Sequence, residues 1–327
     1  MGKLMKVTVV IPNYNGKSFL KDCMESLKNQ TYKDFSVLVV DNASKDGSVE
    51  FLRTEYPETQ VLSLDKNYGF SGAVNEGIKR SDTPYVILLN NDTAADKDFV
   101  GSLVACMDKD EKIFSANPKM IQMYKPELLD DAGDLYCAVG WAFQRGVGQR
   151  SDGYNKECNI FSSCAGASIY RRRIFDEIGV FDEMHFAYLE DIDVGYRARI
   201  AGYRNVYCPK AEVFHVGSGT SGSKYNDFKV RLAARNGIYL NYKNMPLLML
   251  VVNMPTIVFG ILVKYLFFWK KGFRRAFSEG LKEGIRTCRS CKKVCFSFKN
   301  LYSYIRIEAE LIINSFIYFF EFVKRKL

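Results

Sequence analysis

Residues 85–93 read Tyr-Val-Ile-Leu-Leu-Asn-Asn-Asp-Thr, and this stretch decides the fold. Five apolar residues, followed at once by polar ones, predict a short strand that is buried on both faces of a parallel sheet. The carboxyl end of such a strand lies at the edge where open α/β sheets bind ligands. We therefore expect Asp92 and the amides before it to reach that edge, where their oxygens suit Mg²⁺ or Mn²⁺. The alternative is that these polar residues only cap the next helix.

Strand and helix patterns alternate through the first hundred residues. Strands are predicted at 7–11, 35–40, 61–64 and 85–89, and helices at 18–29, 46–55 and 71–79. Such alternation predicts right-handed crossovers and a mostly parallel central sheet with helices on both faces, an α/β fold. Polar or turn residues follow each strand, so the strand ends should together form a cleft at one edge of the sheet.

Two common nucleotide-binding loops are missing after the first predicted strand. Pro12-Asn13-Tyr14-Asn15 stands there, and neither the GxxxxGK[ST] loop nor the GxGxxG fingerprint is present. P-loop ATPases and NAD dehydrogenases use those glycine-rich loops to hold phosphates. The sequence therefore argues against both classes.

The composition is that of a globular protein, with 47% hydrophobic and 25% charged residues in a chain of 327. This length can form one large domain or two. The nine cysteines are an odd number, and the first apolar run, residues 7–11, is too short for the core of a signal peptide. We expect reduced thiols and a cytoplasmic location.

Four segments that contain or follow the predicted strands resemble a known family. They are Val9-Val10-Ile11-Pro12-Asn13-Tyr14-Asn15, Val39-Val40-Asp41-Asn42-Ala43-Ser44, Asn67-Tyr68-Gly69-Phe70-Ser71-Gly72 and Leu89-Asn90-Asn91-Asp92. Together they are similar to the opening of family 2 glycosyltransferases, in particular the branch with bacterial rhamnosyltransferases. The resemblance implies a GT-A fold, a nucleotide-diphosphosugar donor and transfer with inversion.

The resemblance also assigns a donor site and a divalent metal site, Mg or Mn. The implied donor-binding residues are Pro12, Asn13, Tyr14, Asp41, Lys66, Asn67, Gly69 and Asn91. Asp92 would be the last carboxylate of a DxD metal motif, and His215 would complete the metal site, with the glycine- and serine-rich segment 217–222 as a loop over the donor. Asn90 stands where many members have the first Asp, so we expect weaker metal binding. The alternative is that these residues serve only turns and helix caps.

Three carboxylates within four residues, Glu190, Asp191 and Asp193, open a helical pattern that runs to about residue 201. The helix dipole alone favours acids in a first turn, so they could merely stabilise the helix. They cannot all face water while their apolar neighbours are buried, so at least one should point toward the cleft. The resemblance assigns the catalytic base to Asp191, with Glu190 supporting it. Asp193 can pair with Arg197 at i, i+4.

The C-terminal region is basic and apolar. From residue 240 onward there are 16 Lys and Arg against 5 Asp and Glu, and residues 245–263 carry no charge over 19 positions. That run is long enough for a membrane span, but a single span would place the basic residues 270–327 away from the catalytic side, against the positive-inside rule. We expect instead helices that lie in an anionic membrane surface, with no nucleic acid partner. The alternative is packing on the catalytic domain or on a second subunit.

The predicted organisation is a GT-A domain at 1–244, with a nucleotide-sugar half at 1–107 and an acceptor half at 108–244, followed by a membrane-interfacial tail at 245–327. The expected activity is transfer of a sugar, with rhamnose the first hypothesis, to a hydroxyl of a lipid-linked or polysaccharide acceptor. The expected location is the cytoplasmic face of the membrane. A nucleotidyltransferase or a non-catalytic scaffold on the same fold are the alternatives, and the oligomeric state is left open.

Overall fold

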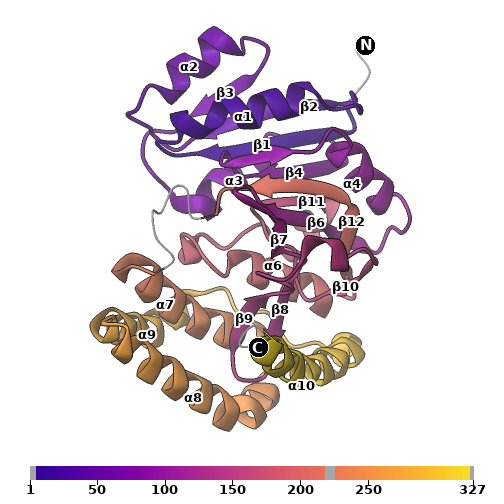
Figure 1. Ribbon diagram of the computed structural model, residues 1–327. Helices are drawn as coiled ribbons and strands as arrows, with labels where there is room; N and C mark the ends of the chain where they lie inside the picture. The colour runs from indigo at the N-terminus through magenta and orange to yellow at the C-terminus, as the bar shows by residue number, and fades with distance from the viewer. Residues whose placement is uncertain (1–4, 218–224, 325–327) are drawn as a thin grey trace.

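The strand predicted at residues 85–89 is present as β4 (Tyr85–Leu89), and every side chain in it is buried. The computed structural model describes residues 5–217 and 225–324. Within these residues β4 lies in the middle of a ten-stranded sheet with the central order β10-β12-β6-β11-β4-β1-β2-β3. Figure 1 shows the sheet in the upper part of the molecule and a layer of helices below it.

The alternation predicted for the first hundred residues is confirmed. β1 (Val7–Asn13), β2 (Phe35–Asp41) and β3 (Gln60–Ser63) pair in parallel, and β1 also pairs in parallel with β4. The helices between them are α1 (Lys17–Lys28), α2 (Ser48–Glu55) and α3 (Gly69–Lys79). α2 begins two residues later than predicted, because the Asp46 carboxylate accepts the Ser48 N–H from outside the helix.

The other half of the sheet is added from later in the chain. Its strands are β5 (Thr93–Ala95), β6 (Ile113–Gln122), β7 (Lys125–Asp131), β10 (Cys158–Ile160), β11 (Ala167–Arg171) and β12 (Arg204–His215). β11 is antiparallel to both β4 and β6, and β12 is parallel to β6. β6 and β12 therefore run in the same direction as β1 and β4, and the predicted mostly parallel sheet is confirmed.

Helices cover both faces of the sheet. Successive residues of a strand point to opposite faces, and in β4 both sets are apolar, so each face needs a cover. Ile87 and Leu89 of β4 belong to a hydrophobic core shared with α1 and α4 (Phe99–Met107). Val86 and Leu88 belong to a second core shared with α3, α5 (Arg172–Ile178) and α6 (Glu190–Ile200). A strand buried in this way on both faces needs the continuous apolar run that the sequence has there.

The C-terminal region forms the lower layer. It contains α7 (Asp227–Asn244), α8 (Leu247–Lys270), α9 (Arg274–Thr287) and α10 (Leu301–Lys324). The hairpin of β8 (Asp134–Cys137) and β9 (Trp141–Gln144) reaches down to these helices (Figure 1). The Ala138 N–H donates to the Leu311 carbonyl, and Asn314 donates to the Tyr136 carbonyl. The hairpin thus shares one hydrophobic core with α7, α8 and α10.

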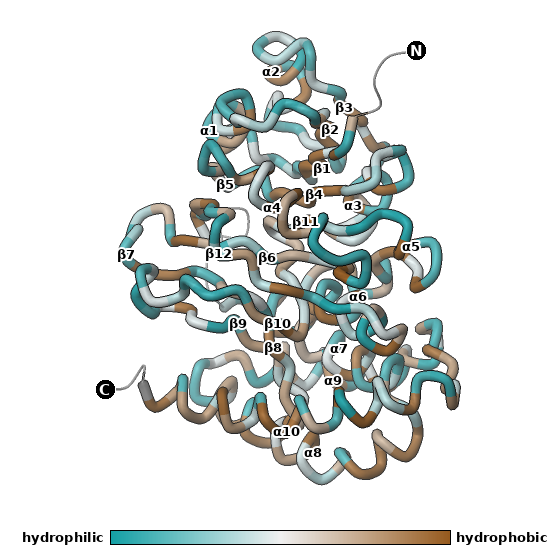
Figure 2. The backbone as a smooth tube through the Cα atoms, turned by 90° about the vertical axis from the view of Figure 1, so that its right-hand side faces the viewer, coloured by the Kyte–Doolittle hydropathy of each residue, from teal (hydrophilic) through white to brown (hydrophobic). Residues whose placement is uncertain are grey.

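α8 and α10 leave large apolar side chains exposed, and Figure 2 shows hydrophobic residues along both helices at the lower edge of the molecule. Among the described residues, α8 is a helix long and apolar enough to cross a membrane, and only 17% of its apolar window is buried. We call the exposed side chains of the two helices the apolar face. It comprises Leu247, Leu248, Val251, Val252, Phe259, Leu262, Leu266 and Trp269 of α8 and Ile305, Ile312, Ile313, Phe316, Phe319 and Phe320 of α10.

Candidate functional site

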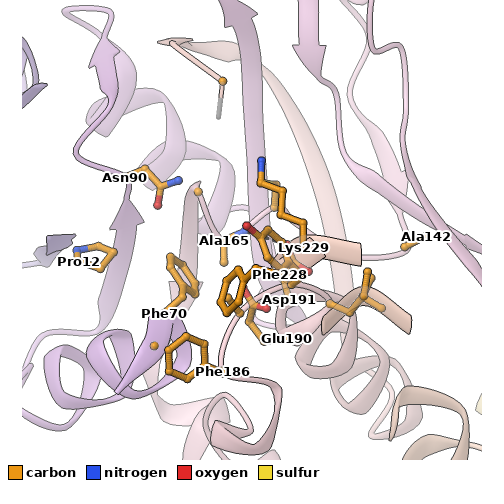
Figure 3. Close-up of a pocket in the computed structure, with 18 of the residues that line it drawn as sticks. Pro12, Phe70, Asn90, Ala142, Ala165, Phe186, Glu190, Asp191, Phe228 and Lys229 are labelled. Atoms are coloured by element: carbon orange, nitrogen blue, oxygen red, sulfur yellow. Dashed lines mark hydrogen bonds between the residues drawn. The ribbon is translucent and has the colours of Figure 1, made fainter. Parts of the chain in front are cut away.

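A cleft of about 920 Å³ opens at the carboxyl edge of the sheet. In Figure 3, Pro12 and Asn90 lie on one side of it, Ala142 of β9 lies on the other, and Glu190 and Asp191 lie between them. The cleft extends from the ends of β1 and β4 to Phe268 on α8. It therefore joins the nucleotide-sugar half predicted from sequence to the helical layer.

Amide and carboxylate side chains build the cleft wall at the ends of β1, β2 and β4. The Asn13 amide donates to Asp41 (2.8 Å) and to Ser44 (3.1 Å), and it accepts from Asn91 (2.7 Å). Asp41 also accepts the Ser44 N–H, as a turn residue would. Asp41 is buried behind the wall, so it orients Asn13, which lines the cleft.

A second amide network holds the segment that precedes α3. Asn42 donates to Asn67 (2.9 Å) and to the Gly69 carbonyl (3.0 Å), and it accepts the Tyr68 N–H (2.9 Å). Asn67 and Gly69 line the cleft. Lys66 is exposed, with its ammonium 4.9 Å from the centre of the Tyr68 ring, and it is outside the described lining of the cleft.

The predicted donor residues thus fall into two groups. The residues that line the cleft are Pro12, Asn13, Tyr14, Asn67, Gly69 and Asn91. Asp41 lies one layer behind them and Lys66 lies on the surface. Asn42, which the prediction omitted from the donor set, also lines the cleft and connects both networks to the sheet.

Asp92 and His215 lie together because β5 pairs with the end of β12. Thr93 is the register partner of His215, and the Asp92 carboxylate is 3.3 Å from His215 Nε2. On the other side of the ring, His215 Nδ1 is 2.7 Å from Asp130 of β7. Burial alone would lower the pKa of His215, but the hydrogen bonds to Asp130 and Asp92 outweigh it and raise the pKa to about 10.

These side chains fit a divalent cation. The Asp92 oxygen and His215 Nε2 are close enough to contact one ion, and both atom types are ordinary ligands of Mn²⁺ or Mg²⁺. A carboxylate that holds the far ring nitrogen, as Asp130 does, is the usual way to orient a metal-binding histidine. Residues 218–222 of the loop expected to cover the donor lie outside the described residues.

Asp191 stands at the start of α6, half-buried and facing the cleft. Its oxygens accept the Ile192 N–H (2.8 Å) and the Ala165 N–H (3.4 Å). Burial raises the pKa of Asp191, and the backbone donors oppose the shift. Glu190 is buried beside it, and burial and the charge of Asp191 raise the pKa of Glu190 well above its usual range. Glu190 Oε2 has no hydrogen-bond partner among the described residues.

Further acids gather next to Asp191. Ligand atoms of Asp134, Cys164 and Asp191 lie within 4.8 Å of one another. Burial raises the pKa of Asp134 and of the Cys164 thiol well above their usual values. Raised pKa values make both groups poorer metal ligands, because a metal ion binds their deprotonated forms. Such neighbours keep Asp191 in a medium of low polarity, which favours its proton-accepting role.

The segment before Asp191 has an unusual backbone. Phe186, Tyr188 and Leu189 have φ angles of 61°, 71° and 67°, a region that costs side-chain-bearing residues about 1–3 kcal/mol each. Gly69 permits this path, since a Cβ on it would lie 2.4 Å from the Phe186 carbonyl oxygen. The Phe186 carbonyl instead accepts the Ser71 N–H (3.2 Å).

Side chains of α7 hold this strained segment. Asn236 is fully buried and donates to the carbonyls of His185 (2.9 Å), Ala187 (2.9 Å) and Tyr188 (2.7 Å). Arg235 donates to the His185 carbonyl from the same side. These bonds fix the path of the chain that delivers Asp191 to the cleft.

Asp193 serves structure and not the cleft. Its buried carboxylate pairs with Arg197 (3.0 Å) as predicted and also with Lys243 of α7 (2.9 Å), and Asn244 donates to its other oxygen (2.8 Å). Lys243 continues to Asp182 (2.6 Å). The network ties α6 to α7 and to the chain before the strained segment.

Comparison with known proteins agrees with this architecture. Residues 8–179, more than half of the chain, match the family model described as Glycosyl transferase family 2. Among curated proteins, the chain is similar to N-acetylglucosaminyl-diphospho-decaprenol L-rhamnosyltransferase of Mycobacterium tuberculosis. The two are 26% identical over 242 residues, 65% of this chain and 77% of the relative.

Solved structures with the same fold include S. aureus TarS 1-349 in complex with UDP-GlcNAc. The TM-score is 0.58 at 15% identity, covering 93% of this chain and 91% of that one. GalNAc-T7 with UDP, GalNAc and Mn²⁺ gives a TM-score of 0.59 at 16% identity, covering 73% of this chain and 48% of the other, about half its length. At these identities the likeness shows the fold alone, and the expected GT-A fold is confirmed.

The buried network around Asp193 gives a stability prediction. Asp193→Asn leaves the charges of Arg197 and Lys243 buried with one partner fewer, and we expect the free energy of unfolding to fall by about 3–5 kcal/mol. Asp152→Asn is the matched control, because Asp152 pairs with Arg150 on the surface, and we expect almost no change there. Urea unfolding followed by circular dichroism measures both, and equal effects would contradict the structural role of Asp193.

Proposed function

The chain belongs to glycosyl transferase family 2, and we propose that it moves a sugar from a nucleotide diphosphosugar to an acceptor hydroxyl with inversion. The donor lies against the ends of β1, β2 and β4, where Asn13, Asn67 and Asn91 line the cleft. The acceptor enters from the side of β9. The observation that carries this proposal is Asp191, a half-buried carboxylate of raised pKa between these two sides.

The sugar in this proposal is rhamnose, from a deoxythymidine- or uridine-diphospho donor, and the acceptor is lipid-linked or a polysaccharide. Support comes from the Mycobacterium tuberculosis relative, whose name gives rhamnose as the sugar it transfers and N-acetylglucosaminyl-diphospho-decaprenol as its acceptor. The product belongs to cell-surface glycan synthesis.

The chemistry is a direct displacement with one base. Asp191 takes the proton of the acceptor hydroxyl as its oxygen attacks the anomeric carbon, and the bond from that carbon to the diphosphate oxygen breaks. A positioned base contributes about 10²–10⁴-fold in rate, most effectively when its pKa is raised toward the working pH. Glu190 supports the base as a buried acidic neighbour at the start of α6, next to Asp191.

Asp92 and His215 would hold the divalent cation, with Asp130 fixing the histidine ring. A cation there would balance the negative charge of the leaving nucleoside diphosphate. The structure of GalNAc-T7, which has the same fold, contains Mn²⁺ together with UDP and GalNAc. Asn90 contributes an amide oxygen where a second carboxylate would bind more strongly, so millimolar metal is the appropriate test concentration.

The donor and base roles are separable by two variants. We expect wild type with Mn²⁺ to be stabilised against heat by one nucleotide diphosphosugar and to turn it over. Asp92→Asn should lose the metal-dependent part of this stabilisation. Asp191→Asn should keep the stabilisation and lose at least about 10²-fold in transfer rate. Thermal shift and release of nucleoside diphosphate measure the two effects.

Several results of that experiment would count against the proposal. Stabilisation by a nucleoside triphosphate with release of pyrophosphate would favour a nucleotidyltransferase. The absence of any stabilisation by sugar nucleotides under any metal would favour a scaffold protein. Full transfer activity in Asp191→Asn would remove the assigned base.

Asn236 provides a test of the strained segment. Asn236→Asp keeps the size of the side chain but replaces donors by oxygens that repel the carbonyls of residues 185, 187 and 188. We expect kcat to fall by roughly 10²-fold, since a displaced catalytic group loses about that much, while donor KM stays within about twofold. Gln30→Glu is the control, a buried amide outside the cleft lining that donates to the carbonyls of Ser26 (3.1 Å) and Asp96 (2.7 Å), and it should keep kcat. Equal losses in both variants would refute the positioning role.

The proposal includes a place for the protein on the cytoplasmic face of a membrane, as a peripheral protein. The apolar face of α8 and α10 supports this, because such an area of exposed apolar side chains is more than a monomer normally carries. Exposed basic residues lie at the end of α8 and the start of α9, namely Lys270, Lys271, Arg274 and Arg275. Cations beside an apolar face complement anionic lipid head groups.

Sedimentation with vesicles tests this placement. We expect binding to vesicles that contain phosphatidylglycerol, weaker binding at high salt, and release at alkaline pH as for a peripheral protein. Leu248→Asp with Val252→Asp should weaken binding by at least about tenfold, because a charge placed in the acyl region costs about 2.5–3.5 kcal/mol. Tyr124→Asp, at an equally exposed site on the β6–β7 turn, should not. Retention after alkaline washing would indicate a span, and no binding would indicate that another subunit covers the face.

A further inference from the structure

A small cavity of about 80 Å³ lies where the helical layer meets the β8–β9 turn. Residues of α7, α8 and α9 surround it together with the turn at 139–141. Val230, Ala233 and Phe268 line both this cavity and the large cleft. The cavity is therefore the neighbour of the acceptor end of the cleft, and it has room for several water molecules or one phosphate group.

Lys264 of α8 reaches this cavity, whose lining is otherwise mostly apolar. Its ammonium lies 5.4 Å from the centre of the Trp141 ring, and no carboxylate of the described residues pairs with it. Burial lowers the pKa of Lys264 to about 8, in agreement with a missing counter-ion. A half-buried cation without an anion is costly to maintain, which makes a structural role alone a poor explanation.

Asn241 of α7 supplies the second polar side chain. The Tyr136 hydroxyl donates to Asn241 Oδ1 (2.6 Å), so the amide oxygen is occupied and the NH₂ group faces the other way. That nitrogen lies 3.4 Å from where a Cβ on Gly140 would be, and Gly140 lines the cavity. Trp141 bonds the Gly260 carbonyl with its own N–H (3.2 Å). Within residues 5–217 and 225–324, Lys264 and the Asn241 NH₂ group therefore present N–H donors without a matching acceptor, which favours an anion.

The position of Lys264 on α8 relates the cavity to the apolar face. Ile257, Ile261 and Phe268 share its side of the helix and line the cavity, while the apolar face points the other way. Gly260 lets α8 press against the turn, since a Cβ there would lie 2.1 Å from the Val139 carbonyl. An anion in the cavity would thus lie on the inner side of α8, and lipid chains could pack on the apolar face on its outer side.

We propose that Lys264 and Asn241 bind a phosphate group of the lipid-linked acceptor, at the boundary between the cleft and the apolar face. This inference rests on the proposed function, because it takes the acceptor to be a lipid phosphate. The sugar of the acceptor then extends along β9 toward Asp191, and the lipid chain leaves along α8. A phospholipid head group has the same chemistry and is the alternative source that the experiment separates.

The two tryptophans of the chain, Trp141 and Trp269, make the site measurable. In a full-length Trp269→Phe background, the emission of Trp141 reports on the cavity. We expect farnesyl diphosphate, without any sugar donor, to change this emission. Lys264→Met and Asn241→Asp should each weaken its apparent Kd by roughly tenfold or more, as for loss of a charge-assisted hydrogen bond. Asn241→Asp keeps an acceptor for Tyr136, and Lys21→Met, an exposed lysine of α1, should leave the Kd unchanged.

Several outcomes would overturn the inference. One is an unchanged Kd for farnesyl diphosphate in Lys264→Met. Another is the same Lys264-dependent signal from farnesol, or from phosphatidylglycerol vesicles alone, which would assign the site to a chain or a head group. A lower Tm of Lys264→Met would assign the lysine to folding, whereas we expect the Tm to hold or rise. Donor turnover measured on the same preparation separates failure of this site from failure of the proposed function.

Discussion

The buried carboxylate of Asp193 is the interaction on which the catalytic side of the molecule depends. It pairs with Arg197 of α6 and with Lys243 of α7. These ion pairs join the two helices. Asp191 lies two residues before Asp193 on the same helix, about half a turn away. The ion pairs that fix α6 against α7 therefore also fix the position of Asp191. The strained backbone at residues 186, 188 and 189 is tolerated because α7, held in place by the same pair, supplies Asn236.

The two ends of the cleft differ in their electrostatics. At the end of β12, His215 lies between the carboxylates of Asp92 and Asp130, whose hydrogen bonds raise its pKa, so a divalent cation would have to displace the proton on Nε2. Glu190 and Asp134 have no such partner among the described residues, and burial raises the pKa of both carboxyls. Carboxyl groups therefore have a histidine partner at one end of the cleft and raised pKa values at the other, because their surroundings differ.

The sheet was predictable because its strands in the first hundred residues are short apolar runs with polar ends. That pattern can be recognised from the local sequence alone. The pairing of Asp193 with Arg197 was predictable for a similar reason, since it depends only on helical spacing. Asp130 and Asp134 were not predicted, although three acids around Gly133 were visible in the sequence, because their place beside His215 and Asp191 depends on how β7 and β8 fold back. The positive φ angles at Phe186, Tyr188 and Leu189 could not be predicted, because these residue types do not favour that conformation. The hydrogen bonds from Asn236 of α7 explain them.

The hairpin of β8 and β9 has its turn seated in the helical layer, where Leu311 and Asn314 satisfy its backbone. Because those backbone groups have no strand partner on that side, the hairpin would be left with bare polar groups and an open core if α10 were absent. α10 is thus a folding requirement of a wall of the cleft whose Tyr136 lies 178 residues before Asn314. During synthesis this wall stays incomplete until α10 has left the ribosome, so the cleft takes its working form only after that helix has been made.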